Sequence, residues 1–381
     1  MVTAGGEAGR SAPAAPRLLS LDVFRGATVA GMVLVNNPGS WRHVYPPLQH
    51  ADWHGWTPTD LVFPFFLFIV GVSIAFALGR RREAGEARST LAARALRRAT
   101  VIFALGLLLH AIPSFDFSTI RIPGVLQRIA VCYLAAALVF LRAGWRGQLV
   151  VACAALAGYW AALTLVPVPG FGAGDLGKEG NLAAWIDRTV LGPHIWRVGR
   201  VYDPEGILST VPAIATTLAG ALAGQWMRGA GSGRRMMAGL AGAGVASGVL
   251  GLAWGLSHPI NKSLWTGSYV LFTAGAALIV LAACYWVIEV RGSRWWTPPL
   301  AALGVNALGI FFLSTLAARM LVVTKVMDAG RPRPLQAVLF DAVAGGFPSP
   351  ALASLAWAAA NVMVWTLLAW PLFRRGLRFS V

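Results

Sequence analysis

Long uninterrupted apolar runs recur along the 381 residues of this chain, and they decide what it can fold into. One of them extends from Leu61 to Gly79 without a charged residue. A helix of about 18 or more such residues crosses a hydrocarbon core roughly 30 Å thick, where only helices and closed barrels satisfy their backbone hydrogen bonds. The runs are too long and too continuous for barrel strands, so the sequence predicts an all-α polytopic membrane protein.

The apolar runs predict about ten transmembrane helices in one bundle. We expect residues 1–16, which are rich in Gly, Ala and Pro, to form a flexible cytoplasmic tail, and residues 17–381 to form one transmembrane domain. The apolar segment 335–347 is too short to span, and we expect it to lie at the outer interface or to re-enter. The spans are predicted near 21–38, 59–79, 97–112, 124–141, 148–167, 207–227, 236–256, 266–289, 299–323 and 351–373.

Arginines lie between the apolar runs, and their placement predicts the topology. The composition is 57% hydrophobic and 12% charged, with a formal net charge of +17. The basic residues form no stripe with interleaved aromatics, which argues against nucleic acid as a partner. They gather at alternate ends of the runs, as the positive-inside rule predicts for cytoplasmic loops. Both termini are therefore expected in the cytoplasm, and the loops rich in Trp, Asp and His outside it, at the inner membrane if the host is bacterial.

Several common kinds of site have no pattern in this sequence. The three cysteines lie inside apolar runs without metal or redox spacing, and packing explains them. No phosphate-binding loop, Rossmann glycine pattern or H-E-x-x-H motif occurs. A zinc site of His43, His50, His54 and Asp60 is one reading, since two of these histidines could share a helical face. No tight set of three ligands is visible, so no metal is predicted.

Several polar side chains lie inside or at the ends of apolar runs, where burial is costly and a function is the default hypothesis. Each also has a structural reading. An acidic residue suits a helix N-terminus, an asparagine can join helices by hydrogen bonds, and an arginine can anchor a cytoplasmic helix end. The sequence leaves both readings open. The residues are Asp22, Arg25, Asn36, Asn37, Asp60, Gln127, Arg128, Lys262 and Asn306.

The stretch QHADWHGWTPTD, residues 49–60, places two histidines, two aspartates and two tryptophans before the second apolar run. An imidazole titrates near neutral pH and can take a proton from an incoming nucleophile. His50 is therefore a candidate general base, with Asp52 and Asp60 as orienting or charge-stabilising partners. The alternative is a packing role at the membrane interface, and composition alone favours His50 little over the other histidines.

The stretches RLLSLDVFRGATVAGMVLVNN and QHADWHGWTPTDLVFPFFLFIVGVSIAF strongly resemble the heparan-α-glucosaminide N-acetyltransferase family of transmembrane acyltransferases and its bacterial relatives. The resemblance continues through RIPGVLQRIAVCYL, YDPEGILSTVPAIATTLAG, INKSLWTGSYVLFTAG and GVNALGIFFLS, and covers most of residues 17–320. It implies the transfer of an acetyl group from cytosolic acetyl-CoA, across the membrane, to a glucosamine-type amine.

The resemblance also implies roles for particular residues. The family's active-site histidine, in the motif H-A-x-W-x-G, corresponds to His50, and its catalytic-site asparagine to Asn36. His54 is a departure, because it stands where relatives often carry asparagine. His50 would act as general base and Asn36 would donate to the thioester carbonyl, with an acetyl-histidine intermediate as the competing scheme. Further candidates are Arg25, Arg97, Arg98 and Arg128 for binding CoA, and Asp60, Asp52, His54, Asn306 and Lys262 as supporting residues.

Three classes of function fit these observations. The favoured one is a transmembrane acetyltransferase that acts on an amino sugar or related glycan, with an O-acetyltransferase of a cell-envelope polysaccharide as a variant. A polytopic transporter of a small polar solute would use the same buried polar groups for its path, and a non-catalytic membrane scaffold is the third class. Expected partners are acetyl-CoA, the acceptor and membrane lipids, with a homodimer as one expected assembly.

Overall fold

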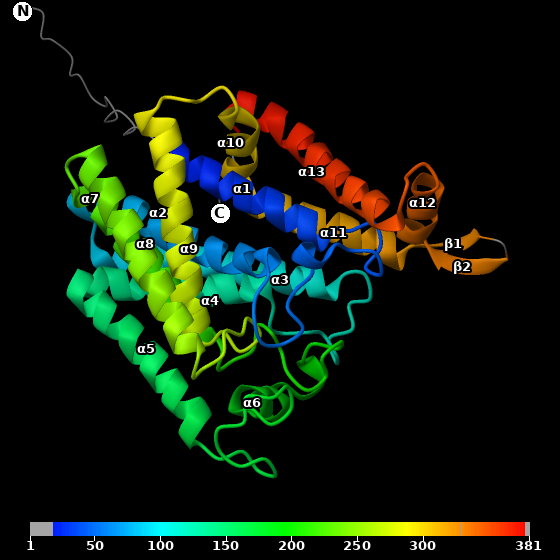
Figure 1. The fold of residues 1–381 in the computed structure, drawn as a ribbon, viewed down its shortest axis with the longest axis horizontal. Coiled ribbons are helices and arrows are strands. Elements are labelled where there is room, and N and C mark those ends of the chain that lie inside the picture. Colours follow the sequence, from blue (N-terminus) through cyan, green and yellow to red (C-terminus); the bar gives the residue numbers. More distant parts are fainter. Residues whose placement is uncertain (1–17, 329, 378–381) are drawn as a thin grey trace, which may run out of the picture.

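The computed structural model describes residues 18–328 and 330–377, so the tail predicted at 1–16 lies outside the described residues. The described chain is mostly helical (Figure 1). Its one two-stranded antiparallel sheet pairs β1 (Lys325–Asp328) with β2 (Arg331–Pro334). The helices are α1 (Leu19–Asn36), α2 (Val62–Glu83), α3 (Arg88–Ala111), α4 (Val125–Arg142), α5 (Trp145–Leu165), α6 (Leu182–Leu191), α7 (Thr210–Gly229), α8 (Gly233–Gly255), α9 (Gly267–Tyr285), α10 (Thr297–Val305), α11 (Ala307–Val323), α12 (Leu335–Ala344) and α13 (Pro350–Arg374).

Every apolar run predicted to span is helical, but fewer helices qualify as spans than predicted. Seven described helices are long and apolar enough to cross a membrane: α1, α2, α4, α5, α8, α9 and α13. The pair α10 and α11 adds an eighth if it is one broken span, bent by 81°. The first half of α3 carries four arginines, and α7 is rich in Thr, Gly and Ala. Neither helix is therefore apolar enough to count among the candidate spans. The predicted number of ten, and a single bundle, therefore stay predictions.

Although α7 is not apolar enough to qualify as a span, it is one of the most enclosed helices. It packs against α2, α4, α5 and α9, so its threonines and glycines face protein rather than lipid. At its contact with α2 the two backbones touch: a Cβ added at Gly71 would lie 1.9 Å from the carbonyl oxygen of Thr217, and one at Gly220 would lie 1.9 Å from that of Phe68. Small residues at such crossings replace the hydrophobic driving force that lipid does not supply.

A second close contact joins α1 to α10. A Cβ added at Gly26 would lie 1.8 Å from the carbonyl oxygen of Leu300, and one at Gly304 would lie 2.1 Å from that of Asp22. The chain then bends at Asn306, which lies between α10 and α11 and is buried. This bend turns α11 away from α10, and the residues beside it, Gly304 and Val305, line the large cavity described below.

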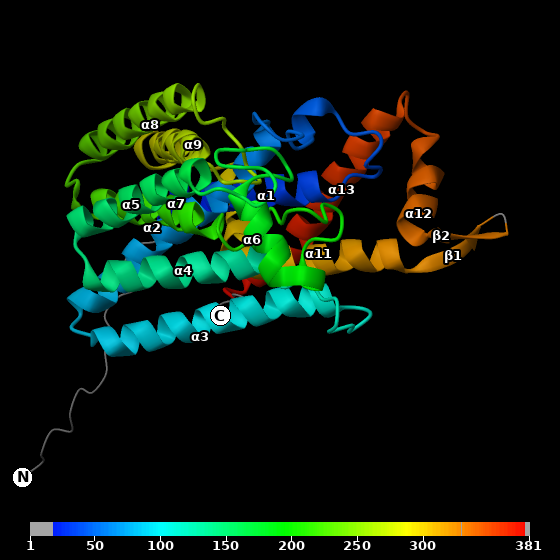
Figure 2. The same ribbon diagram turned by 90° about the horizontal axis from the view of Figure 1, so that it is seen from below.

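The connections divide between two ends of the molecule. Figure 2 shows the loop that follows α1, the short helix α12 and the β1–β2 hairpin toward the right, and the connection between α2 and α3 at the left. The helices α3 and α4 run side by side in both views, as do α8 and α9. The loop that contains His50 and the arginine-rich α2–α3 connection therefore lie at opposite ends, as the alternating charge pattern predicts.

Candidate active site

A cavity of about 1230 Å³ runs along α2 and forms the centre of the candidate site. Its lining includes residues from successive turns of α2 and the 3-10 turn before it, among them Thr59, Phe66, Ser73 and Arg81. Twenty residues of helix are about 30 Å long, which is roughly the thickness of a bilayer's hydrocarbon core. The cavity thus follows α2 over a length comparable to the membrane.

Asp60 lies where α2 begins, and it fixes the loop that carries His50. The 3-10 turn Pro58–Leu61 starts with a capping box, in which the backbone N–H of Thr57 donates to Asp60 Oδ2 over 3.0 Å. The backbone N–H of Ala51 donates to the same oxygen over 3.1 Å. The second oxygen, Oδ1, lies 2.6 Å from Nδ1 of His50. Asp60 is almost fully buried, so it orders both the helix start and the histidine loop.

The contact with Asp60 determines how His50 is presented. A carboxylate only accepts, so Nδ1 of His50 donates to it, and in the neutral ring Nε2 then holds the lone pair. His50 lines the cavity, and its side chain is 47% exposed, whereas that of Asp60 is 1% exposed. This is the arrangement of a buried carboxylate that orients an accessible imidazole, and it is suited to general-base chemistry.

Lys262 completes this group from a distant part of the chain. Its Nζ lies 3.1 Å from Nδ1 and 3.1 Å from Nε2 of His50, and 3.7 Å from Oδ1 of Asp60. It precedes α9, in the turn that joins α8 to α9. Burial lowers the pKa of Lys262, and the negative charge of Asp60 opposes that shift. Lys262 also lines the cavity.

Aromatic side chains from two connections, α1–α2 and α6–α7, line the same end of the cavity. The ring of Trp53 lies 4.9 Å from that of Tyr202, which lies 5.8 Å from the ring of Trp196. The indole N–H of Trp53 donates to the carbonyl oxygen of Leu176 over 2.8 Å, which fixes this ring. All three aromatic residues line the cavity and provide flat apolar faces near His50.

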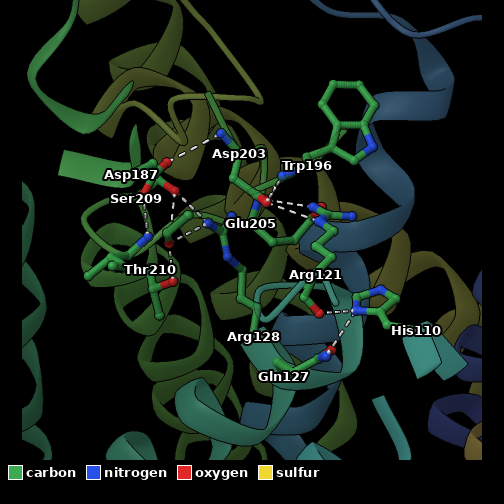
Figure 3. Close-up of polar contacts among 12 residues, drawn as sticks. His110, Arg121, Gln127, Arg128, Asp187, Trp196, Asp203, Glu205, Ser209 and Thr210 are labelled. Carbon is green, nitrogen blue, oxygen red and sulfur yellow. Dashed lines mark hydrogen bonds and ion pairs between the residues drawn. The ribbon is translucent and has the colours of Figure 1, made fainter. Parts of the chain in front are cut away.

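An ion-pair cluster forms the wall beside these rings (Figure 3). Arg121 donates to Oδ2 of Asp203 over 3.0 Å and to Glu205 over 2.5 Å. Arg121 and Glu205 line the cavity, and Asp203 is buried behind them. No role was predicted for these residues from the sequence, although the segment YDPEG belonged to the resemblance. In the sequence they are three charged residues in loops next to apolar runs. That pattern does not predict that their side chains contact one another.

Arg128 lies away from the cavity. It is 2% exposed and is not part of the cavity lining. It donates to Ser209 Oγ over 2.5 Å (Figure 3) and to the carbonyl oxygen of Gly206 over 3.2 Å. Its guanidinium lies 5.1 Å from the ring centroid of Trp265. These contacts hold α4 against the start of α7. The predicted contact of Arg128 with CoA finds no support in this placement and stays a prediction.

Basic side chains line the opposite end of the cavity, and they include two of the predicted CoA ligands. Arg25 donates to Asp22 over 3.1 Å and to Ser73 Oγ over 2.9 Å. Arg98 lies 5.1 Å from the ring of Tyr133. Its neighbour Arg97 is exposed and outside the lining. The basic residues in the lining at this end are Arg25, Arg80, Arg81 and Arg98.

The other predicted residues divide into two groups. Asn36, the last residue of α1, and Asp52 both line the cavity, although the Asp52 carboxylate is 93% exposed and pairs with Lys178. His54 is exposed, lies outside the lining and is 3.3 Å from the amide nitrogen of Asn261. Asn306 is buried at the α10–α11 bend, also outside the lining. Within residues 18–328 and 330–377, no three or more His, Cys, Asp or Glu side chains could together hold a metal ion.

Apolar helices of spanning length, packed around a cavity that follows one of them, define an integral membrane protein. A family model described as "Heparan-alpha-glucosaminide N-acetyltransferase, catalytic" matches residues 17–252, which is more than half of the chain. The chain belongs to this family, and the resemblance drawn from its motifs is confirmed.

Two curated relatives carry the name heparan-alpha-glucosaminide N-acetyltransferase. The human protein is 30% identical over 352 residues, covering 78% of this chain and 52% of the relative. The mouse protein is 29% identical over 353 residues, covering 78% of this chain and 53% of the relative. The chain thus spans about half the length of the curated relatives it matches.

Proposed function

We propose that this protein is a transmembrane acetyltransferase that takes an acetyl group from acetyl-CoA at the arginine-lined end of the cavity and transfers it to an amino sugar at the His50 end. The observation that carries this proposal is the cavity along α2, which has Asp60 and His50 at one end and Arg80 and Arg81 at the other. A donor bound along this cavity could present its acetyl group on one side of a membrane while the rest of the molecule stays on the other side.

The arginine-lined end suits the donor. Acetyl-CoA carries phosphates, and guanidinium groups bind phosphate through paired, charge-assisted hydrogen bonds. Between the two ends the lining is largely apolar, with Phe66, Ile69 and Val70 from α2. An extended arm that ends in a thioester fits such a passage better than a hydrated ion. On this proposal the arginine end faces the cytoplasm, both termini lie there, and the membrane is the bacterial inner membrane.

The His50 end suits the chemistry. Acyl transfer to an amine needs a base for the nucleophile, a thioester within reach and stabilisation of the oxyanion. His50, oriented by Asp60, takes the proton of the amine through Nε2. Asn36 lines the same cavity and would donate to the thioester carbonyl or fix its position. The contact between His50 and Asp60 supports the base role, and the same geometry would also serve an acetyl-histidine intermediate.

The wall beside His50 suits a sugar. Flat rings from Trp53, Trp196 and Tyr202 offer faces on which the apolar face of a sugar ring can pack, and Glu205 offers a carboxylate to hydroxyl or ammonium groups. The human and mouse relatives are named for a glucosaminide acceptor. An amine of the glucosamine type is therefore the acceptor we propose.

The test uses purified protein in lipid vesicles with labelled acetyl-CoA on one side and candidate acceptors on the other. We expect label on glucosamine and none on N-acetylglucosamine, which has the same hydroxyls but no free amine. Label on N-acetylglucosamine or glucose would show an O-acetyltransferase instead. No loss of acetyl from acetyl-CoA with any acceptor would contradict the proposal and favour a transporter or a scaffold.

A further inference from the structure

The position of Lys262 over His50 defines what the lysine can and cannot do. Its Nζ is 3.1 Å from both ring nitrogens. An atom at this distance from both cannot lie in the plane of the ring, because it would collide with the ring carbon Cε1 or with the opposite edge. The ammonium group therefore lies over the face of the imidazole. The lone pair of Nε2, which points outward in the plane, stays open to a substrate.

Lys262 is held beside Asp60 and His50, and part of its ammonium group still faces the cavity. At this end of the cavity Arg121 is engaged by two carboxylates, those of Asp203 and Glu205. Among the described residues its carboxylate partner is Oδ1 of Asp60, at 3.7 Å, a distance that makes an ion pair but leaves the ammonium N–H groups room for another acceptor. The Lys262 side chain is 20% exposed and faces the cavity. Its N–H groups can therefore turn to a ligand there.

The turn that carries Lys262 is held rigidly, so the ammonium group is pre-positioned. Asn261 accepts from the backbone N–H of Leu264 over 2.8 Å through its side chain, and its own backbone N–H donates to Thr266 Oγ over 3.1 Å. Trp265 has a φ of +54°, which is costly for a bulky residue, and it is fully buried against Phe63. Such strain persists only where the surrounding packing imposes it.

We propose that Lys262 is a catalytic residue whose ammonium group donates a hydrogen bond to the carbonyl oxygen of the acetyl thioester and stabilises the oxyanion during transfer. This inference rests on the proposed function. An amine bound to Nε2 of His50 lies about 3 Å from it, and the carbonyl carbon that it attacks lies about 3–3.5 Å further on. Lys262 is 3.1 Å from the same nitrogen and so can reach the carbonyl oxygen.

The transfer step balances with Lys262 unchanged. The amine nitrogen forms the new C–N bond while the carbonyl π pair moves to oxygen, beside the ammonium group. His50 takes the proton that the amine loses. The oxyanion then re-forms the carbonyl, the C–S bond breaks, and the CoA thiolate leaves and is protonated by the imidazolium. Lys262 donates a hydrogen bond throughout and forms no covalent bond.

The test replaces Lys262 and compares it with a second lysine of the same region. Lys262→Met should lower kcat by about 10²–10³-fold, as loss of one oxyanion donor does, with little change in the affinity for acetyl-CoA. Lys262→Arg keeps the charge and should recover part of that loss. Lys178→Met is the matched control, because Lys178 pairs with exposed Asp52 and is outside the cavity lining, and it should turn over near the parental rate.

Binding of acetyl-CoA by each variant shows that it is folded. A Lys262→Met protein that binds acetyl-CoA and keeps near-parental kcat would overturn the inference, and so would acetyl found on Lys262 of the parent by mass spectrometry, which would make it a nucleophile. The proposed function fails separately, if the parent transfers no acetyl at all. Activity that is lost in His50→Ala but kept in Lys262→Met would reject the role of Lys262 alone.

Discussion

At the scale of single residues, Asp60 links the start of a helix to the candidate base. One oxygen accepts from the backbone N–H groups of Thr57 and Ala51, and the other lies 2.6 Å from His50. The orientation of the imidazole is therefore fixed relative to the start of α2. A histidine held by a solvated loop alone would lose this orientation, and with it the assignment of the lone pair to Nε2.

The two histidines of the loop give the sharpest prediction at this scale. His50→Ala should lower the rate of acetyl transfer by about 10²–10⁴-fold, the usual effect of losing a general base. Acetyl-CoA binding should change little, since its phosphates are proposed to bind at the opposite end. His54→Ala should keep substantial activity, because His54 lies outside the cavity lining. Kinetics of both purified variants decide the matter: an active His50 variant beside an inactive His54 variant would mean that the base is misassigned.

His50 was predictable from the sequence through its motif, and the residues around it only in part. Asp60 was a candidate as an acidic residue at the start of an apolar run and as an orienting partner of His50. Lys262 was a candidate only as a polar residue near a span, since a contact over 212 positions has no periodic signal. Glu205 and Arg121 were missed for the same reason. Arg128 was expected at the CoA site because a charge in a span suggests function; it is buried in contact with Ser209 and Gly206, and its contact with CoA stays a prediction.

At the scale of elements, packing between backbones decides which helices lie together. The helical segments were predictable because apolar runs in a membrane have few alternatives to helix. The number of spans was not, because α7 is shielded by its neighbours and needs less apolar surface than a helix in lipid. The glycines of α7 indicate its position better than its hydropathy does, because they permit the close backbone contact with α2.

Gly71 tests this contact. Gly71→Ala should destabilise the protein by about 1–3 kcal/mol, because its Cβ would lie 1.9 Å from the carbonyl oxygen of Thr217 and the two helices would have to separate. Gly158→Ala, on α5, is the control, since a Cβ there meets nothing within 4 Å and alanine favours helix over glycine. Thermal unfolding in detergent measures both variants. Equal melting temperatures for them would show that α2 and α7 do not pack this closely.

At the scale of the whole molecule, charge is distributed unevenly between the two ends of one cavity. Arg25, Arg80, Arg81 and Arg98 line one end, while the other has aromatic and acidic residues around His50. The net charge of +17 is therefore more than a topology signal. Part of it forms a basic mouth that suits a polyanionic donor.

The adjacent arginines of α3 separate these two uses of charge. Arg98→Gln should weaken acetyl-CoA binding, because Arg98 lines the cavity, whereas Arg97→Gln should have a smaller effect, because Arg97 is exposed outside it. The difference should shrink in high salt if the contact is mainly electrostatic. Titration of acetyl-CoA at two salt concentrations gives the answer. Identical affinities for the two variants would leave both arginines as membrane anchors.

The cavity along α2 is also a possible route for proton leakage across the membrane. A water-filled passage of this length would let protons run down the membrane potential whenever no substrate occupied it. The apolar stretch between the ends, with Phe66, Ile69 and Val70, disfavours water and ions, and the arginines at one end repel hydronium and metal cations while they admit a phosphate-bearing donor. We therefore expect vesicles that contain the protein to hold a proton gradient as well as protein-free vesicles do, and a rapid loss of the gradient would show that the apolar stretch and the arginines do not seal the passage.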